Sequence, residues 1–238
     1  MTNKIKLYCL PCAGGSSSLY SKWNRHIKSE IEVVPIELKG RGIRIDEDFY
    51  ENFDGLIDDV YKILSHQIKD SNYALLGFSM GGLVVYEIYK RLTWTGYCDP
   101  KHIFIIGREA PNYRFIRISH LPDEAFLKEI YSYQGIPDEI YTNSDLLNFI
   151  LPQLRSDFEI YETYDKKEIV RTRCNLSVLY GEEDKSIIHE GIFMWKNFAG
   201  AECDFKMFEG GHFFISKMQD EVLSYIESKL KSSLELQN

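Results

Sequence analysis

The fold of this 238-residue chain is decided by one stretch, Tyr73-Ala-Leu-Leu-Gly-Phe-Ser-Met-Gly-Gly-Leu-Val-Val-Tyr-Glu-Ile-Tyr-Lys-Arg91. Its opening residues form a short apolar run that is typical of a buried strand. After Gly77-Phe-Ser-Met-Gly81, apolar residues such as Leu83 and Ile88 recur at helical spacing. The pattern predicts a strand that turns sharply into a helix, with Ser79 at the corner.

A serine at such a corner has the placement that nucleophilic catalysis requires. The hydroxyl is a weak nucleophile that must face both a base and a substrate, and a strained corner holds its oxygen clear of the sheet. Gly77 and Gly81 lack a Cβ, so the strand and the helix can pass close by. The helix start directs its N–H groups toward developing negative charge, which makes the N–H of Met80 a predicted oxyanion donor. The alternative is a glycine-rich helix cap satisfied by Ser79.

Composition limits the classes of protein to which the chain can belong. With 44% hydrophobic and 27% charged residues, it fits one soluble globular domain with an insertion. The net charge of −8 argues against nucleic acid as the main partner. No apolar run approaches the roughly 20 residues of a membrane span. The first residues lead into a strand without a signal peptide, so we expect a cytoplasmic monomer that binds neither nucleic acid nor membrane.

The cysteines argue against redox or metal chemistry. Cys9-x-x-Cys12 has the spacing of a redox pair, but it lies at a strand end with no helix opening directly on it. No second pair stands at metal-ligand spacing. The five cysteines are odd in number and scattered, so we expect reduced thiols and no metal site: Cys9, Cys12, Cys98, Cys174 and Cys203.

Strand and helix patterns alternate through both halves of the chain. Short apolar strands joined by crossover helices predict an α/β fold, with a mostly parallel central sheet and helices on both faces. Sites in such sheets lie beyond the carboxyl ends of the strands. Strands are expected at 4–10, 31–38, 73–76, 103–106, 176–180 and 203–208, and further helices at 19–27, 53–69 and 219–231.

The interval 114–172 interrupts this alternation. It contains helical patterns at 122–131, 143–152 and 157–164 and many aromatic residues. We interpret it as a helical lid inserted into a core made of 1–113 and 173–238, and the alternative is a set of extra core helices packed on the side. Some of its aromatics suit either an apolar tunnel or simple packing: Phe115, Phe126, Tyr131 and Phe149.

Two loops near the end of the chain carry the groups that a serine nucleophile needs. In this class of sheet the chain order is serine, acid, histidine. His212 follows the last strand in a Gly-Gly-His turn and is the predicted base, with His189 as the alternative. In the Gly-Glu-Glu-Asp loop after the preceding strand, Asp184 is the predicted acid and Glu183 the alternative. Taken singly, these residues also suit a backbone-bonded loop histidine and an acidic helix cap.

These predictions specify a mechanism. His212 takes the Ser79 proton as the hydroxyl attacks an acyl carbonyl, while Asp184 holds the imidazole tautomer and stabilises the imidazolium. The second oxyanion donor is expected in the small-residue loop after the first strand, at the N–H of Ala13 or, failing that, Cys12. That loop matches neither Gly-x-x-x-x-Gly-Lys nor Gly-x-Gly-x-x-Gly, so nucleotide binding is not expected.

Motifs spread over nearly the whole chain resemble one family as a set. They are Leu10-Pro-Cys-Ala-Gly-Gly, Glu37-Leu-Lys-Gly-Arg-Gly, Gly77-Phe-Ser-Met-Gly-Gly, Gly107-Arg-Glu-Ala-Pro, His120-Leu-Pro, Leu151-Pro-x-Leu-Arg-Ser-Asp, Gly181-x-x-Asp and Gly210-Gly-His-Phe-Phe. Together they look like the type II thioesterases of nonribosomal peptide and polyketide synthesis. Two residues depart from the pattern: Phe78 stands where many members have histidine, and Cys12 where many have an aromatic residue or histidine.

The resemblance implies an α/β-hydrolase fold with a helical lid. It implies hydrolysis of acyl groups from the phosphopantetheine arm of acyl or peptidyl carrier proteins, which clears misprimed or stalled units. The substrate carries the phosphopantetheine, so no cofactor of the enzyme's own is implied. By similarity, Ser79, Asp184 and His212 take the triad positions, and Ala13 and Met80 the oxyanion positions.

A carrier partner raises a question of charge, because its docking surface is usually acidic and this chain is acidic too. Basic residues flank the predicted lid, and we hypothesise that they form a docking patch, with scattered solvated charges as the alternative: Arg114, Arg117, Lys166, Lys167, Arg171 and Arg173. Two other functions stay open. A carboxylesterase or lipase acting on small esters would use the same triad, and a non-catalytic hydrolase-fold protein would keep the pocket to bind a ligand.

Overall fold

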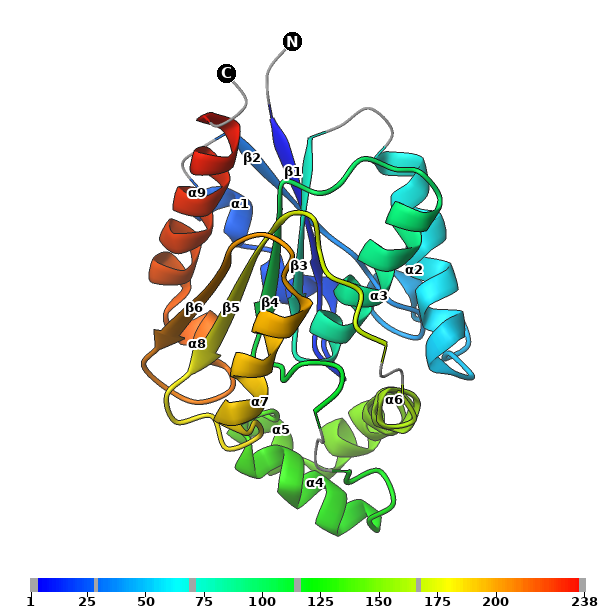
Figure 1. The fold of residues 1–238 in the computed structure, drawn as a ribbon. Helices are drawn as coiled ribbons and strands as arrows, with labels where there is room; N and C mark the ends of the chain where they lie inside the picture. The colour runs from blue at the N-terminus through cyan, green and yellow to red at the C-terminus, as the bar shows by residue number, and fades with distance from the viewer. Residues whose placement is uncertain (1–3, 28–29, 69–71, 114–116, 166–167, 236–238) are drawn as a thin grey trace.

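The computed structural model describes residues 4–27, 30–68, 72–113, 117–165 and 168–235. Six strands form one sheet in the order β2-β1-β3-β4-β5-β6, and every neighbouring pair is parallel (Figure 1). The predicted α/β class is therefore confirmed. The strands are β1 (Ile5–Leu10), β2 (Ile31–Pro35), β3 (Tyr73–Phe78), β4 (His102–Ile106), β5 (Asn175–Gly181) and β6 (Cys203–Phe208).

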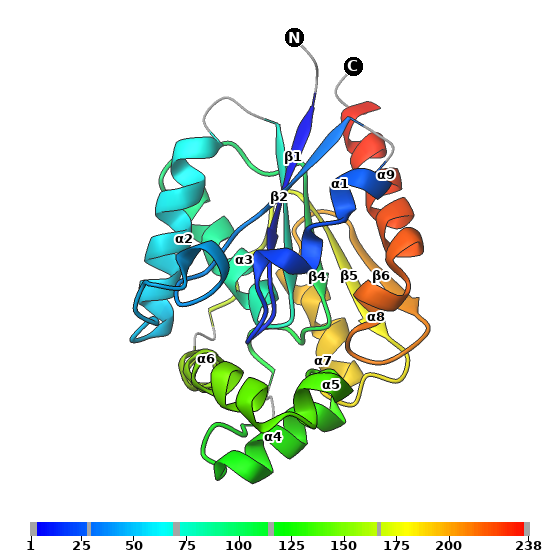
Figure 2. The same ribbon diagram turned by 180° about the vertical axis from the view of Figure 1, so that it is seen from behind.

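Helices cover both faces of this sheet (Figures 1 and 2). One face packs against α2 (Phe53–Gln67) and α3 (Met80–Trp94), and the other against α1 (Trp23–His26) and α9 (Gln219–Glu235). The shorter helices are η1 (Ser17–Tyr20), η2 (Gly42–Arg44), α7 (His189–Phe193), η3 (Met194–Phe198) and α8 (Phe214–Lys217).

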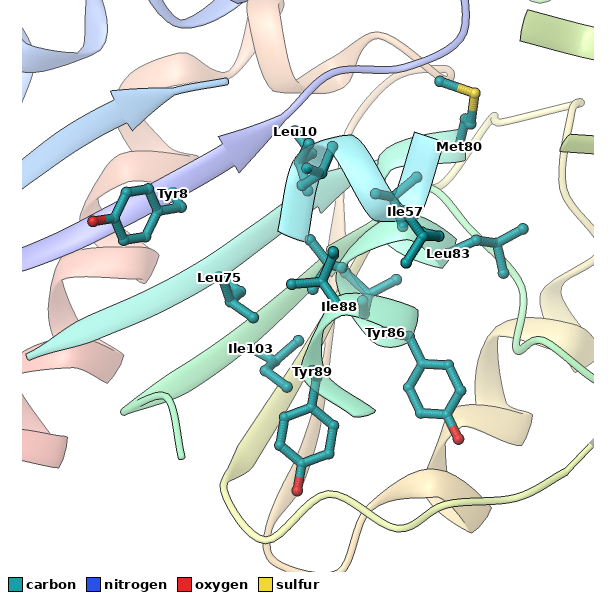
Figure 3. Close-up of a cluster of buried hydrophobic side chains, with 14 of the residues drawn as sticks. Tyr8, Leu10, Ile57, Leu75, Met80, Leu83, Tyr86, Ile88, Tyr89 and Ile103 are labelled. Atoms are coloured by element: carbon teal, nitrogen blue, oxygen red, sulfur yellow. The ribbon is translucent and has the colours of Figure 1, made fainter. Parts of the chain in front are cut away.

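The four inner strands, β1, β3, β4 and β5, are apolar runs because both of their faces are buried. Along β1, Leu7 and Cys9 point to the side of α9, whereas Tyr8 and Leu10 point to the side of α2 and α3. This is the alternation expected of a strand, here with an apolar layer on each side. Figure 3 shows part of the second layer, where side chains of β1, β3 and β4 pack with those of α3.

Two elements predicted outside the lid differ from the structure. The helix expected at 19–27 is instead the short 3-10 helix η1 followed by the single turn α1, so the segment is less regular than its apolar pattern indicated. The strand expected to reach residue 38 ends at Pro35. Strand β2 is an edge strand whose pairing with β1 ends at Cys9 and Pro35, with the Ile36 N–H donating to the Cys9 carbonyl. The missing N–H of Pro35 faces away from β1, where an edge strand needs no partner.

Three helices lie beyond the carboxyl ends of the strands (Figures 1 and 2). They are α4 (Asp123–Ser132), α5 (Asp138–Tyr141) and α6 (Ser144–Glu162), and they share a small core of their own that includes Phe126 and Ile130. The two helices predicted at 143–152 and 157–164 are one continuous helix that passes through Pro152. Burial of Leu154, Ile160 and Tyr161 along this helix outweighs the backbone hydrogen bond lost at the proline. The limits of the lid, 114–172, stay a prediction.

A buried histidine makes the stability of this fold depend on pH. The ring of His102 stacks on Phe104 with 4.4 Å between centroids, and its Nε2 lies 2.8 Å from the Ser177 hydroxyl. Burial, helped by the nearby Lys229 charge, lowers the pKa of His102 from 6.5 to about 4. Between these values the unfolded chain binds a proton that the folded chain does not, so stability falls as the pH falls.

We therefore predict that His102 alone removes about 3 kcal/mol of unfolding free energy between neutral pH and about pH 4. The variant His102→Gln does not titrate and should lose this part of the pH dependence. Urea unfolding of both proteins over that range measures the difference. Parallel stability curves for the two proteins would contradict the prediction.

Candidate active site

Ser79 sits at the corner between β3 and α3 in a strained backbone conformation. Its φ of 53° and ψ of −117° lie in a region that residues with a side chain rarely adopt. The N–H of Ser79 donates to the Ile106 carbonyl of β4 at 2.7 Å, and the Ser79 carbonyl accepts from Gly82 at 2.9 Å. The corner is thereby tied to the neighbouring strand and to the first turn of α3.

The two glycines of the corner are required by close approach. A Cβ at Gly77 would lie 2.1 Å from the Gly81 carbonyl oxygen, and a Cβ at Gly81 would lie 2.5 Å from the Leu10 carbonyl oxygen. The helix start is thus pressed against the carboxyl ends of both β1 and β3. This contact brings the loop after β1 next to Ser79, as a shared oxyanion site requires.

The loops after β5 and β6 are joined to each other by backbone hydrogen bonds. The N–H of Glu182 donates to the Phe208 carbonyl and the N–H of Glu183 to the Gly210 carbonyl, each at 2.9 Å. A Cβ at Gly181 would lie 2.5 Å from the Gly210 carbonyl oxygen, so the two loops meet closely. The acidic loop and the Gly-Gly-His turn therefore form one unit.

Asp184 and His212 meet within that unit. Both are buried, and His212 Nδ1 lies 2.7 Å from Asp184 Oδ2. Burial alone would raise the pKa of Asp184, but hydrogen bonds from His212 and Ser186 hold it below its ordinary value of 3.8. The aspartate thus stays charged and accepts the Nδ1 proton, which leaves His212 Nε2 as the nitrogen that can take a proton.

Ser186 is a further partner that sequence reasoning missed. Its hydroxyl donates to Asp184 Oδ1 at 2.6 Å and lies 2.8 Å from His212 Nδ1, and its N–H also donates to Asp184 Oδ1. Asp184 therefore accepts hydrogen bonds on both carboxylate oxygens. The only signal in the sequence was a serine two positions after an aspartate, which is a common turn pattern.

One pocket is lined by three of the residues that the sequence predicted for the site. Ser79, His212 and Ala13 line it together, and it encloses about 660 Å³ with its open mouth included. Within the described part of the chain, the Ser79 side chain makes no hydrogen bond. This is common in unliganded enzymes, because catalytic hydrogen bonds often tighten only when substrate binds. The rest of the wall is largely apolar or aromatic: Ile118, Ile130, Tyr133, Phe158, Tyr161, Ile187 and Phe213.

The aromatics considered as a tunnel lining do not form this wall. Phe126 is fully buried in the core of the lid helices, Tyr131 stacks on Tyr141, and Phe149 is 70% exposed. Phe115 lies outside the described residues. Isoleucines and aromatics from the lid, from the segment before α7 and from the turn after His212 line the pocket instead.

The alternative base and acid are placed elsewhere. His189 begins α7, packs its ring on Tyr180 at 5.4 Å, and does not line the pocket that Ser79 lines. Glu183 is exposed, whereas Asp184 is the member of the acidic loop that touches His212. The geometry therefore favours the predicted pair over both alternatives.

The backbone around Ser79 offers two N–H groups for an oxyanion. The N–H of Met80 is the first of α3, and helix N-termini leave such groups without an intrahelical partner. Among the residues described, neither it nor the N–H of Ala13 donates to another group. The neighbouring Gly15 N–H instead closes a turn onto the Cys12 carbonyl at 3.0 Å.

The Cys9-x-x-Cys12 pair and Phe78 have packing roles in the structure. Cys9 and Cys12 are free, buried thiols, and burial raises the pKa of Cys12 to about 12, which disfavours the reactive thiolate. Phe78, where many family members have histidine, lies with its ring centroid 5.0 Å from that of His212. It forms an apolar wall behind the imidazole.

The structure separates the arginines of the proposed docking patch. Arg117 is exposed and adjoins Ile118 of the pocket wall. Arg171 and Arg173 are also exposed, but they precede β5, and Arg173 pairs with Asp99 ahead of β4 at 3.0 Å. They therefore lie at the amino ends of the strands, opposite the pocket. The remaining members lie outside the described residues: Arg114, Lys166 and Lys167.

The described residues contain neither a cluster suited to a metal ion nor a helix that could span a membrane. No cluster of three or more His, Cys, Asp or Glu side chains is placed to hold a metal ion in that part of the chain. No described helix is both long and apolar enough to cross a membrane.

A parallel sheet with a serine corner at the carboxyl end of β3 and helices over that edge defines the α/β-hydrolase class. Comparison with known proteins identifies the family within this class. A family model described as the thioesterase domain matches residues 5–230, so the chain belongs to the thioesterase family. It is a thioester hydrolase, and the resemblance to type II thioesterases is confirmed by relatives from biosynthetic pathways.

Three of these relatives cover almost the entire chain. The protein called linear gramicidin dehydrogenase LgrE, of Brevibacillus parabrevis, is 32% identical to this chain. The match covers 97% of this chain and 89% of LgrE. The gramicidin S biosynthesis protein GrsT, of Aneurinibacillus migulanus, is 29% identical, and the match covers 96% of this chain and 90% of GrsT. The crystal structure of ClbQ, from the colibactin NRPS/PKS pathway, has a TM-score of 0.92 at 26% identity. The superposition covers 98% of this chain and 99% of ClbQ.

Gly107 offers a test of how closely the imidazole is positioned. It has φ of +59°, and a Cβ there would lie 3.1 Å from His212 Cε1. We predict that Gly107→Ala displaces the ring and lowers kcat/KM for an acyl thioester by about ten- to a hundredfold. Thioester hydrolysis followed by thiol release measures the loss.

Gly96 provides the matched control. Its φ of +85° imposes the same left-handed strain on alanine, but a Cβ there would meet nothing within 4 Å. Gly96→Ala should lose about 1 to 2 kcal/mol of stability and keep its activity. Equal activity losses in the two variants would show that backbone strain, and not the His212 contact, is responsible.

Proposed function

We propose that this chain hydrolyses acyl thioesters on the phosphopantetheine arm of acyl or peptidyl carrier proteins. In nonribosomal peptide or polyketide synthesis, this reaction clears misprimed or stalled units. The observation that carries the proposal is the buried Asp184–His212 hydrogen bond beside Ser79 in a largely apolar pocket. Relatives that serve such pathways support the choice of substrate class.

The reaction proceeds in two halves. His212 Nε2 accepts the Ser79 proton as Oγ attacks the thioester carbonyl, and the charged Asp184 stabilises the imidazolium. Collapse of the tetrahedral intermediate breaks the C–S bond, and His212 returns the proton to the departing thiol. A water molecule, deprotonated by His212, then attacks the acyl-enzyme ester, which releases the acid and restores the Ser79 hydroxyl.

The surroundings assist each half. The N–H groups of Ala13 and Met80 stabilise the oxyanion, and one such donor is typically worth about 3 kcal/mol. The apolar wall holds the acyl chain by burial, and the sulfur end of the pantetheine arm reaches Ser79 while the carrier stays outside. The enzyme needs no cofactor of its own in this scheme, because its substrate supplies the pantetheine.

Intact mass spectrometry tests the proposal. A carrier protein loaded in parallel with several acyl groups is incubated with the wild type and with Ser79→Ala. We predict that the wild type returns the carrier to its free-thiol form, whereas the variant is slower by at least about a thousandfold. An alanine variant that cleaves as fast as the parent would refute the mechanism.

A second substrate separates the rival functions. If an oxygen ester of the same acyl chain is hydrolysed faster than the carrier-bound thioester, the chain is a general esterase. If ligand binds tightly but no acyl group is lost, the chain is a binding protein.

For carrier docking we retain Arg117, the exposed arginine beside the pocket wall. We predict that Arg117→Glu raises KM for an acyl carrier protein about threefold or more while KM for acyl-pantetheine is unchanged, because only the carrier brings acidic surface. Arg171→Glu makes the same charge change at the opposite edge of the sheet and should leave both KM values unaltered. Equal effects of Arg117→Glu on the two substrates would argue against docking.

A further inference from the structure

Two motifs that the catalytic scheme leaves unused meet in the folded chain. Arg41, from the loop after β2, and Asp157, from α6, form a bidentate ion pair with both N···O distances at 2.7 Å. The partners are 116 residues apart in the sequence, and their side chains are 2% and 1% exposed. Such deep burial of two charges needs a reason other than surface solubility.

The pair is bonded to the loop that follows β1. Asp157 Oδ2 also accepts the N–H of Gly14 at 2.7 Å, and Arg41 donates to the Gly15 carbonyl at 3.0 Å. One turn earlier on α6, Gln153 Nε2 donates to the Gly14 carbonyl at 2.7 Å. Both polar groups of Gly14 are therefore bonded to the lid helix.

Steric contact holds the same residue from the side. Gly14 has φ of +70°, and a Cβ there would lie 2.2 Å from Leu154 Cδ2 on α6. At the far end of the loop, the Glu37 carboxylate accepts both the N–H and the hydroxyl of Ser17. The loop closes a turn of its own from the Gly15 N–H to the Cys12 carbonyl, and the contacts with α6 and Glu37 fix where that turn lies.

The residue next to Gly14 is Ala13, whose N–H points to no partner among the described residues and which lines the pocket beside Ser79. A donor stabilises an oxyanion only when it is preorganised toward the position that the oxygen takes. Because peptide units are planar, holding the Gly14 N–H also constrains the carbonyl of Ala13 and hence the rotation of that residue.

We propose that Asp157, held by Arg41, is a positioning residue that aims the Ala13 N–H at the oxyanion. The inference rests on the proposed function only in that Ala13 serves as a donor there. The lid helix then does more than cover the pocket, because its position sets the geometry of the reacting centre. A buried ion pair adds little net stability compared with apolar residues, so its use here is that it bonds both the Gly14 N–H and the Gly15 carbonyl.

The first test is Asp157→Asn, measured with acyl-pantetheine so that carrier docking plays no part. The amide keeps the shape but replaces a carboxylate acceptor with a weaker neutral group. We expect kcat to fall by about ten- to a hundredfold, less than for a deleted oxyanion donor, with KM changed by less than about threefold. The control is Arg155→Gln on the same helix, which removes the ion pair with Asp123 inside the lid and leaves the loop contacts intact.

A second variant removes the risk that an uncompensated buried charge unfolds the protein. Arg41→Met combined with Asp157→Leu replaces the pair by apolar residues, an exchange that commonly leaves stability unchanged or raised. It also leaves the Gly14 N–H and the Gly15 carbonyl without these partners, so kcat should stay low, while the thermal midpoint falls less than in Arg41→Met alone, which leaves the Asp157 charge unpaired. A stable double variant with wild-type kcat would overturn the proposal.

A direct readout of the oxyanion site completes the experiment. A trifluoromethyl ketone that adds Ser79 to form a charged hemiketal should lose affinity in the double variant by the same factor as kcat. An uncleavable thioether of pantetheine, which forms no oxyanion, should bind unchanged. If both ligands weaken equally, or if Arg155→Gln lowers kcat as much, the effect belongs to the pocket or lid as a whole and the positioning role is wrong. Failure of the wild type to cleave thioesters would instead overturn the proposed function.

Discussion

The left-handed backbone at Ser79 is the constraint on which the rest of the site depends. A side chain in that conformation is unfavourable by itself, and the corner persists because α3 is pressed onto the ends of β1 and β3. Only glycine fits at positions 77 and 81 under that contact. The strain therefore follows from packing against the sheet. It fixes the position of the Ser79 hydroxyl, and the catalytic histidine and the oxyanion donors must be placed around that position.

Parallel strands bring those other groups to the same edge. The loops after β5 and β6 carry Asp184 and His212, Gly107 follows β4 and lies beside the imidazole, and β1 leads into the loop with Ala13. None of these loops is anchored by the sheet alone. The acidic loop is bonded to the histidine turn, and the loop after β1 is bonded to the lid helix, so the site is held together by contacts between loops as much as by strands.

The parts of this arrangement that the sequence predicted were those with local patterns. Apolar runs located every strand, and the strand at 203–208 agrees at both ends. The signal is most continuous in strands that are buried on both faces, such as β3 and β4. The serine corner, the acid and the histidine turn were visible since each follows a strand. Pattern reasoning was wrong at Pro152, where packing of α6 outweighed the local preference of proline.

What could not be predicted depends on contacts between distant residues. Nothing in the spacing of Arg41 and Asp157 shows that they pair. The sequence also left open whether Phe126 and Phe149 line a tunnel or only pack, and the pocket wall is formed by isoleucines and other aromatics. Ser186 was equally hidden, because its role appears only when Asp184 and His212 are placed beside it.

The bonds between α6 and Gly14 have a consequence for how such enzymes can diversify. Each residue of an α-helix turns its successors by about 100°, so one insertion ahead of Asp157 would carry its carboxylate to another face of α6. Gln153 and Asp157, which both bond Gly14, stand one helical turn apart, and that register must be inherited intact. A lid can be exchanged between relatives to change the preferred length of the acyl chain. We expect such exchanges to vary α4 and α5 and to keep Gln153 and Asp157 on the same face of α6.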